Sequence, residues 1–404
     1  MSLRTFAKTA AYHARRGRVR ALAMPRSVAP LRRALHLPSN RVVSPLEATS
    51  HDGLRVTVLD RAETFRRALP QLVGDPAALA FFQKRTTEPA YTSYVAELEE
   101  GRFWSSPFGA VLTRNDDFVP DFSRDPWGPH LHAIWNRARL PAPRRVAGRA
   151  LYLVTPEADA NYHHWMIDLL PRVMLARRAG FTPQSFSHVF VNACERSFQR
   201  ETLERCGFTA TQILPLERDD HVCVDSLVVP WLKPTNQAMP LEDVAALREL
   251  LLPRTAARGR RIFLSRRDAG FRRLLNEDEL HPLLKRHGFE IVSTGTMDVA
   301  SQARLFAEAE WIAGASGAAF ANLVFAPPGA RVLEIAPPQW LAVYHWMISA
   351  RCGLNHTVLL ADGDHRTTQP DITGRRRNFT LSPDRLASWL EGETSTQCSA
   401  NSAA

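Results

Sequence analysis

Short apolar runs alternate with longer stretches of helical periodicity along residues 149–361. The strand-like runs, rich in Val, Ile, Leu and Ala, lie at 150–155, 188–192, 226–230, 261–265, 290–293, 311–315, 331–335 and 356–361. Between them apolar residues recur at helical spacing, at 163–179, 197–206, 241–252, 277–287, 301–309, 317–325 and 341–353. Such βαβ alternation is typical of parallel sheets covered by helices and predicts an α/β fold.

Other parts of the chain have a different texture. Between residues 94 and 122 short apolar pairs lie among Gly and Asp turns, which predicts the short strands of a β-rich lead-in. The polar stretch 253–259 separates a helical segment from a strand and indicates a domain boundary near 235–260. The predicted organisation is an arm (1–46), a β-rich lead-in of the amino-terminal domain (47–148), an amino-terminal α/β domain (149–240), a carboxyl-terminal α/β domain (255–390) and a disordered tail (391–404).

Composition adds the broad class. The chain has 404 residues, of which 45% are hydrophobic and 23% charged, and these values exclude disordered, collagenous and coiled-coil chains. No apolar run approaches the roughly 18 residues of a membrane-spanning helix, and no secretory signal is evident. The five cysteines are scattered, so neither a disulfide framework nor a zinc ribbon is predicted. We expect a cytoplasmic protein.

The net charge of +10 is concentrated at the amino terminus. Residues 1–46 hold ten basic residues and no acidic one, which leaves 41 basic and 41 acidic residues in the remaining chain. A basic amphipathic segment could bind an anionic membrane surface; a plain basic tail and a transit peptide are the alternatives. Because the rest of the chain is neutral, nucleic acid is not a predicted partner.

Polar residues in a helical pattern follow the strand-like run 150–155. His164, Asp168 and Arg172 are spaced i, i+4 and i+8, so on a helix they share one face. In α/β proteins ligands commonly bind next to the carboxyl ends of strands. We interpret His164 or Asp168 as a base for a hydroxyl group, because Pro171 would cost a purely structural helix about 3 kcal/mol. A capped core helix is the structural alternative, and a metal site lacks a third ligand at a fixed spacing.

A second polar segment follows the run 261–265. Arg266, Arg272 and Arg273 precede a predicted helix that Asn276 would cap, with Glu279 completing a capping box. Guanidinium groups beside the free amides of a helix N-terminus suit a diphosphate. A solvated basic loop is the structural alternative.

The third segment is the small-residue turn of 311–322. It lets the backbone approach a phosphate, although Phe320 stands where a dinucleotide fingerprint has its third Gly or Ala. Tight packing of helix on strand would also explain the small residues. Asp362 and Asp364 have the form of a metal-nucleotide motif but lie beside a Gly turn, so we interpret them as a turn and predict no metal site.

Taken together and in this order, the segments resemble glycosyltransferase family 61, in its bacterial capsular-polysaccharide type. Residues 162–172 are similar to its Tyr-x-His-Trp-x-x-Asp-x-Leu-Pro-Arg segment, 264–277 to its Ser-Arg and Asn-Glu segment, 314–329 to its Gly-rich segment and 332–334 to its closing Val-x-Glu. One departure is Ser316, which stands where the family commonly has His.

The resemblance implies a GT-B-like architecture, with two Rossmann-like domains facing across a cleft, and an inverting transfer without an obligatory metal or cofactor. Asp168, with His164, would be the catalytic base, and His163 and Arg172 would lie on the acceptor side. The donor would be bound by residues of the second and third segments: Arg266, Arg272, Arg273, Asn276, Glu277, Ser316, Gly317, Ala318 and Glu334.

The implied partners are a nucleotide-sugar donor, UDP-linked in the first instance, and a glycan or glycolipid acceptor in cell-surface polysaccharide synthesis. The arm 1–46 would allow peripheral attachment at the inner face of the cell membrane. Two other functions stay open. One is another nucleotide-sugar enzyme such as an epimerase, and the other is a nucleic-acid-binding protein that uses the basic arm.

Overall fold

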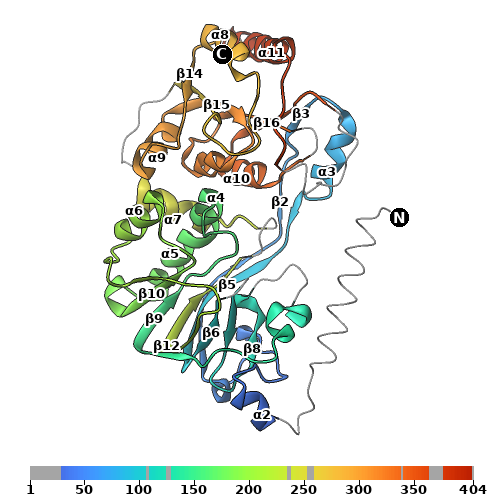
Figure 1. Cartoon of the computed structure of the whole chain (residues 1–404). Helices are drawn as coiled ribbons and strands as arrows, with labels where there is room; N and C mark the ends of the chain where they lie inside the picture. Colours follow the sequence, from blue (N-terminus) through green and yellow to red (C-terminus); the bar gives the residue numbers. More distant parts are fainter. Residues whose placement is uncertain are drawn as a thin grey trace. The chain divides into compact units, whose positions relative to one another are not determined.

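The computed structural model describes residues 29–105, 109–123, 129–233, 238–252, 259–337, 340–363 and 376–402. These residues form two compact units: unit 1 comprises 29–62 and 91–233, and unit 2 comprises 63–90 and 238–402 (Figure 1). Most of the arm (1–28), the polar stretch 253–258 and Asp364 lie outside the described residues. The predicted domain order differs from this division at 63–90, which the sequence assigns to the amino-terminal domain.

Unit 1 contains, within its described residues, a nine-stranded mixed sheet. Strands β9, β10, β11 and β12 run parallel to one another, whereas β1, β5, β6, β7 and β8 add antiparallel pairs. Their bounds are β1 (Leu54–Ala62), β5 (Tyr91–Glu99), β6 (Arg102–Trp104), β7 (Ala110–Leu112), β8 (Phe118–Val119), β9 (Arg144–Tyr152), β10 (His188–Val191), β11 (Ile213–Pro215) and β12 (His221–Pro230). Strands β5 to β8 lie where the sequence predicts short strands; β6, β7 and β8 are short, whereas β5 has nine residues.

Helices follow the parallel strands of unit 1. The helical segments are α2 (Ala29–Ala34), α4 (Tyr162–His164), the π-helical turn η8 (Trp165–Leu169), α5 (Leu170–Arg178) and α6 (Ser197–Arg205). Buried apolar side chains of the strands form the core, in which the ring of Phe103 contacts those of Tyr152 and Phe190. Each of these three side chains is fully buried, so the sheet is held on one face by aromatic packing.

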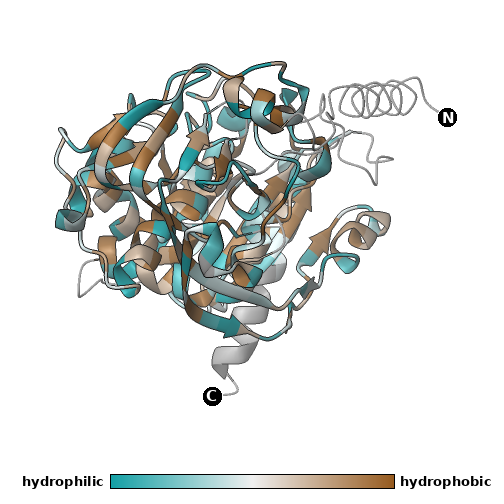
Figure 2. Cartoon of the chain, turned by 90° about the horizontal axis from the view of Figure 1, so that it is seen from below, coloured by the Kyte–Doolittle hydropathy of each residue, from teal (hydrophilic) through white to brown (hydrophobic). Residues whose placement is uncertain are grey.

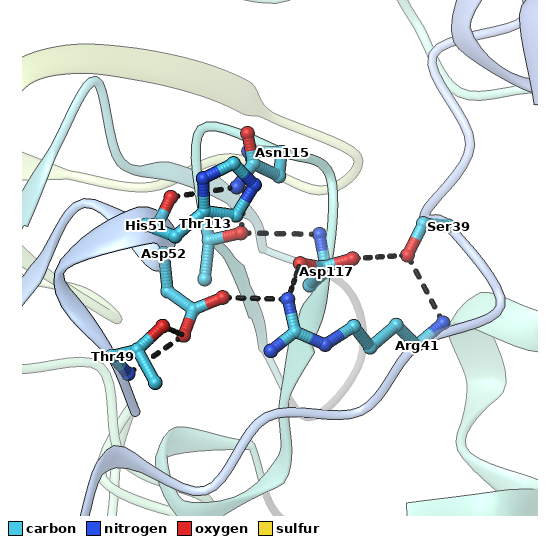
Figure 3. A network of polar contacts seen from close by, with 8 residues as sticks. All are labelled: Ser39, Arg41, Thr49, His51, Asp52, Thr113, Asn115 and Asp117. Carbon is cyan, nitrogen blue, oxygen red and sulfur yellow. Dashed lines mark hydrogen bonds and ion pairs between the residues drawn. The ribbon is translucent and has the colours of Figure 1, made fainter. Parts of the chain in front are cut away.

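Residues 29–46 belong to the fold of unit 1, which corrects the prediction of a separate arm ending at residue 46. Leu37 and Val43 are buried, and Arg32 is buried with its Nε donating to the carbonyl of Pro38 at 2.8 Å. Figure 3 shows the polar network in which Arg41 reaches both Asp52, at 2.6 Å, and Asp117, at 3.2 Å. The correction follows from these contacts, which a count of basic residues does not reveal.

Unit 2 contains a parallel sheet of six strands within its described residues, in the order β14, β13, β15, β16, β17, β3. The strands are β3 (Gln71–Val73), β13 (Arg260–Leu264), β14 (Phe289–Val292), β15 (Ala309–Ala315), β16 (Arg331–Ala336) and β17 (Asn355–Leu360). Together with the parallel strands of unit 1, this sheet confirms the predicted α/β class. A separate antiparallel pair joins β2 (Phe65–Arg66) to β4 (Thr87–Glu88).

The segment 63–90 joins unit 2 for two reasons. Its strand β3 extends the parallel sheet beside β17. The carboxylate of Glu88 is fully buried and binds Arg67 at 2.8 Å and Arg351 at 2.7 Å. Removing a partner from such a buried pair is strongly destabilising, so these bonds fix the segment where the sequence pattern alone does not place it.

The remaining helices of unit 2 cover its sheet. They are α3 (Leu79–Gln83), α7 (Leu241–Leu251), α8 (Glu277–Arg286), α9 (Val299–Ala307), the 3-10 helix η10 (Ala318–Phe325), α10 (Tyr344–Cys352) and α11 (Pro383–Ser402). The helix α11 extends to Ser402 through the stretch where the sequence predicts a disordered tail. In Figure 2 brown, hydrophobic stretches lie along strands and helices and many outer loops are teal, as burial of one face requires.

Candidate active site

The first predicted constellation lies on a helix that begins directly after the loop following β9. Asn161 caps this helix, since its side-chain oxygen accepts a hydrogen bond from the backbone N–H of His163 at 3.0 Å. The helix then widens into the π-turn η8, in which the N–H of Leu170 reaches back five residues to the carbonyl of Trp165. Turns of this kind are rare and often occur at functional sites.

Pro171 explains how a lysine enters this turn. A proline has no N–H, so Pro171 cannot donate a hydrogen bond to the carbonyl of Ile167, four residues earlier. Lys233 supplies the donor, because its Nζ lies 2.7 Å from that carbonyl oxygen. The same ammonium group lies 4.0 Å from Oδ1 of Asp168, and both side chains are buried.

A chain of charged groups runs from the protein surface to Asp168. Nδ1 of His164 lies 2.7 Å from Oδ2 of Asp168, and Nε2 of the same ring lies 2.8 Å from Oε2 of Glu157. The side chain of Glu157 is 55% exposed, whereas those of His164 and Asp168 are 7% and 5% exposed. His164 therefore connects a buried carboxylate with one that reaches solvent.

The environment sets the charge of this pair. Burial alone would lower the pKa of His164, but the hydrogen bonds with Asp168 and Glu157 outweigh it and raise the pKa to about 9. Burial alone would raise the pKa of Asp168, but the hydrogen bond from His164 and the charge of Lys233 lower it to about 2. At neutral pH the pair is therefore an imidazolium and a carboxylate.

The third member of the predicted stripe has a different role. The guanidinium of Arg172 is 98% buried and donates to the carbonyl groups at the carboxyl ends of β9 and β12, those of Tyr152, Val154 and Pro230, at 3.0 to 3.1 Å. It also donates to the hydroxyl of Thr155 at 3.0 Å. Arg172 thus ties two strand ends to α5, which corrects its prediction as an acceptor-side residue, since its donors face the backbone.

His163 lies next to the pair. Its ring packs edge-on against that of His164 with the centroids 5.4 Å apart, and it is buried. Its positive character contributes to the low pKa of Asp168. Of the four residues predicted for this side of the reaction, the structure therefore brings His163, His164 and Asp168 together.

In unit 2 the second and third segments meet at the carboxyl ends of neighbouring strands. Arg266 follows β13 and Gly317 follows β15, and a Cβ atom on Gly317 would overlap the guanidinium of Arg266. A larger residue there would displace the guanidinium of Arg266 from its present position. Gly314 is more strictly constrained, since its φ is +159° and a Cβ would come within 2.9 Å of the backbone oxygen of Leu264.

Arg266 has an unusual environment for a cation. Its Nε donates to the carbonyl of Arg272 at 3.3 Å and its Nη2 to that of Phe271 at 3.0 Å. Burial lowers its pKa from the usual value, yet a guanidinium stays charged in a protein. Among the described residues no carboxylate forms an ion pair with this group, and two of its five N–H donors are used. Such a group is suited to an anionic ligand.

Glu277 and Asn276 hold this loop in place. The buried carboxylate of Glu277 accepts from the hydroxyl of Ser265 at 2.6 Å and from the backbone N–H of Arg266 at 3.3 Å. Asn276 occupies the N-cap position of α8, but its side chain makes no capping bond and pairs with the backbone of Leu381. The predicted capping box is therefore wrong. Glu277 holds the start of the loop through Ser265 and Arg266, and Asn276 holds its end through the backbone of Leu381.

The two other predicted arginines are placed differently from Arg266. The guanidinium of Arg272 lies 4.5 Å from the ring centroid of Trp340 and 5.3 Å from that of Phe271, so it is stacked on aromatic rings. Arg273 is exposed, and its backbone N–H donates to Asn378 at 3.0 Å. Of the three arginines, the one whose guanidinium packs on the Gly317 turn is Arg266.

The turn after β15 is only partly open to a ligand. The backbone N–H of Ser316 donates to the carbonyl of Ile335 at 3.0 Å, so this amide is not available to a phosphate, which corrects the prediction for it. Its hydroxyl is buried and has no hydrogen-bond partner among the described residues. Gly317 and Ala318 begin the 3-10 helix η10 and remain candidates for backbone contacts.

Glu334 is buried on β16 between two histidines. Its Oε1 lies 2.8 Å from Nδ1 of His345, and its Oε2 lies 3.3 Å from Nε2 of His356. Burial opposes ionisation, but the neighbouring His345 and His356 hold the pKa of Glu334 well below its usual range. Because Glu334 is 2% exposed and its carboxylate faces these rings, its position does not support the prediction that it binds the donor.

The described part of the chain contains no group of three His, Cys, Asp or Glu side chains placed to hold a metal ion. Asp362 pairs with Arg385 at 3.1 Å, and Asp364 lies outside the described residues. Within the described ranges, no helix combines the length and apolar character needed to span a bilayer.

Two residues of the site were not predicted from the sequence. Lys233 carries a signal that could have indicated it, since it is one of only four lysines among 51 basic residues and follows the strand-like run 226–230. Glu157 gives no such signal. It has a left-handed backbone, with φ +65°, which is uncommon for a residue other than glycine.

Comparison with known proteins agrees with the resemblance noted in the sequence. The family model described as Glycosyltransferase 61 matches residues 162–333, which include the π-turn, Lys233, Arg266 and Gly317. This match supports a glycosyltransferase function and, more closely, family 61. No curated protein matches the chain.

Proposed function

We propose that the protein is an inverting glycosyltransferase that moves a sugar from a nucleoside-diphosphate donor to a hydroxyl of a glycan or glycolipid. The observation that carries the proposal is Arg266, a half-buried cation without a carboxylate partner among the described residues, packed on the Gly317 turn at the carboxyl edge of a parallel sheet. Ligands of α/β proteins commonly bind at such an edge. The leaving diphosphate requires positive charge in the transition state.

Asp168 would be the base for the acceptor hydroxyl. His164, with both ring nitrogens facing carboxylates and a pKa of about 9, carries two protons at neutral pH and has no lone pair to offer. Asp168 is ionised, and His164 and Lys233 orient its two oxygens. In an oxocarbenium-like transition state the acceptor hydroxyl becomes acidic as the new bond forms, so a carboxylate can take its proton.

The finer parts of the proposal rest on the resemblance to family 61. They are a GT-B arrangement, a UDP-linked donor, a role in bacterial surface polysaccharide synthesis and a cytoplasmic location with peripheral membrane attachment. An epimerase would share the donor residues but would need no acceptor base. The conversion of a nucleotide sugar in the absence of any acceptor would favour it.

The proposal predicts that two variants each impair a different property, donor binding or transfer. Arg266→Ala should weaken UDP binding at least tenfold, as expected for a lost charge-assisted contact. Asp168→Asn should leave UDP binding unchanged and lower transfer by about 10²- to 10⁴-fold. A thermal-shift screen of nucleotide sugars selects the donor, and calorimetry with UDP measures both variants.

Arg267→Ala is the matched control for Arg266→Ala. Arg267 is the neighbouring arginine, is exposed and pairs with Asp278, so its loss should leave UDP affinity within twofold of the wild type. Equal UDP affinities of the Arg266 and Asp168 variants would contradict the assignment of the two sites.

Transfer should also persist in EDTA, because Arg266 already provides charge for the diphosphate. The measurement is the transfer rate before and after chelation. Complete loss of transfer that Mn²⁺ or Mg²⁺ restores would assign a metal role to Asp362 and Asp364.

A further inference from the structure

The loop between β13 and α8 crosses the carboxyl edge of the sheet in unit 2. Arg266 lies at its start, and Arg272 near its end stacks on Trp340, which follows β16. Because β15 lies between β13 and β16 in the sheet, the loop passes over the strand whose following turn holds Gly317. The loop, Trp340 and the turn therefore surround one stretch of this edge.

Phe271 lies in this loop, directly before Arg272. Its carbonyl accepts the Nη2 donor of Arg266 at 3.0 Å, and the next residue, Arg272, has the left-handed φ of +54°. The guanidinium of Arg272 contacts the ring of Phe271 as well as that of Trp340. Despite these contacts Phe271 is 38% exposed. The contacts of Arg272 thus hold the exposed ring of Phe271, whose carbonyl binds Arg266, in a position to contact a ligand of Arg266.

A nucleoside diphosphate has groups that fit both Arg266 and an aromatic ring beside it. Its diphosphate would bind to Arg266, and its base lies one ribose away from the diphosphate. Nucleobases stack on aromatic side chains whatever their sequence, because each base has a π-face. The guanidinium of Arg272 contacts the rings of Phe271 and Trp340, and this cation–π contact fixes the orientation of the Phe271 ring.

Resting on the proposed function, we propose that Phe271 stacks on the nucleobase of the donor. Arg272 and Trp340 are positioning residues that hold the Phe271 ring beside the diphosphate site. This assigns Arg272 to the base end of the donor, away from the diphosphate that the sequence pattern suggested for it. The ligand class is a nucleoside diphosphate, and both pyrimidine and purine bases can satisfy the contact.

Calorimetry separates the base from the diphosphate. UDP, ADP, GDP and inorganic pyrophosphate are titrated into the full chain. Phe271→Ala should weaken the nucleoside diphosphate that binds wild type by about tenfold or more, and leave pyrophosphate affinity unchanged. Arg266→Ala should weaken both ligands. Phe271→Tyr keeps an aromatic ring and should restore affinity to within about twofold of wild type.

Two further variants test the positioning role. Arg272→Leu removes the cation between the rings and should weaken the nucleoside diphosphate without changing pyrophosphate, whereas Arg272→Lys should recover part of the loss. Leu241→Ala is the control, because Leu241 is 50% exposed on α7 in the same unit and should change neither ligand. Thermal melting of each variant identifies any that fails to fold.

The outcomes are distinct. If wild type binds pyrophosphate and a nucleoside diphosphate equally well, or if Phe271→Ala binds the nucleotide as wild type does, the stacking assignment is wrong and the proposed function stands. If wild type binds none of the four ligands, the donor site itself is wrong. If Phe271→Ala changes only the KM for the acceptor, the ring belongs to acceptor recognition and the inference is overturned.

Discussion

Two arginines that follow strand ends, the buried Arg172 and the half-buried Arg266, have different uses in this molecule, and their partners distinguish them. Arg172 donates to backbone carbonyls at two strand ends, whereas Arg266 forms no ion pair with a carboxylate among the described residues and uses two of its five N–H donors. Helical spacing predicted Arg172, and the place after a strand-like run predicted Arg266, because such patterns show where a residue lies and not what its side chain contacts. The partner of a buried polar group decides its role.

Arg172→Gln should therefore affect stability and not donor binding. A glutamine has fewer donors and a shorter reach, so the carbonyl groups of Tyr152, Val154 and Pro230 would lose partners they now have. We expect the free energy of unfolding to fall by about 3 kcal/mol, with UDP affinity unchanged. Urea denaturation and calorimetry measure the two quantities. A variant of wild-type stability that has lost UDP binding would return Arg172 to the site.

The pair of His164 and Asp168 should make stability depend on pH. The pKa of His164 is about 9 in the folded protein and 6.5 when unperturbed. A group with a raised folded pKa stabilises fully below its unfolded value, and the contribution disappears as pH rises through the folded value. The unfolding free energy of wild type should therefore fall between about pH 6.5 and 9 as His164 loses its proton. The His164→Gln variant has no such proton to lose, so this contribution to the fall should be absent from it.

The quantity to compare is the difference between wild type and His164→Gln, because other groups titrate in the same range. We expect this difference in unfolding free energy to shrink by on the order of 2 kcal/mol from pH 6 to pH 9.5. Urea titrations at the two pH values measure it. A difference that grows as pH rises would show that His164 is neutral in the folded state.

At the scale of elements, local pattern was sufficient for most helices and strands and failed where distant residues decide. The helix predicted at 241–252 is Leu241–Leu251, and the strand predicted at 311–315 is Ala309–Ala315. The π-turn was not predicted, because it depends on Lys233 approaching the Ile167 carbonyl from another part of the chain. The three-residue strand β3 is too short to show a period, so its place beside β17 was also missed.

Pro171→Ala tests whether the π-turn serves the site. The alanine restores an N–H that can bond to the carbonyl of Ile167 and so compete with Lys233. Lys233 would then hold Asp168 less closely, and the pKa of Asp168 would rise. We expect unfolding free energy within about 1 kcal/mol of wild type and kcat/KM lower by about tenfold, with its acidic limb moved to higher pH.

Rate against pH for Pro171→Ala and for Pro183→Ala provides the comparison. Pro183 also lies at the start of a short helix in unit 1, Pro183–Ser185, where its carbonyl accepts a hydrogen bond from the side chain of Gln212. The Pro183→Ala variant should therefore have the same dependence of rate on pH as wild type. Identical profiles for both variants would mean that Pro171 shapes the helix without influencing Asp168.

At the scale of the whole molecule, the described residues form two compact units, and this division of the chain differs from the predicted order of domains at residues 63–90. The hydrophobic pattern assigns domains as consecutive segments of the chain. In the structure the chain leaves unit 1 after residue 62, contributes residues 63–90 to unit 2, and returns to unit 1 at residue 91. The buried carboxylate of Glu88 and the strand β3 make this excursion stable. Neither feature has a sequence signature, since a single buried glutamate and three strand residues resemble any surface segment.

The proposed membrane attachment would depend on the charge of the amino terminus, and the structure shows which of its basic residues already bind within unit 1. Of the ten basic residues in 1–46, the three beyond residue 28 already have partners: Arg32 the Pro38 carbonyl, Arg33 the carboxylate of Asp116, and Arg41 those of Asp52 and Asp117. Residues 1–28 hold the other seven basic residues and no acidic one. Any attraction of the amino terminus to anionic lipid therefore depends mainly on these seven.

Deletion of residues 1–28 should abolish flotation with anionic vesicles, because it leaves 44 basic and 41 acidic residues and reduces the net charge from +10 to +3. The unfolding midpoint should stay that of wild type. Deletion of 1–46 should in addition destabilise unit 1, since it removes the buried Leu37 and Val43 and the partner of Asp52. Flotation should also weaken in 1 M salt, where the Debye length falls from about 10 Å at 0.1 M to about 3 Å. Vesicle binding that survives both the shorter deletion and high salt would place the contact on an apolar surface of the remaining chain.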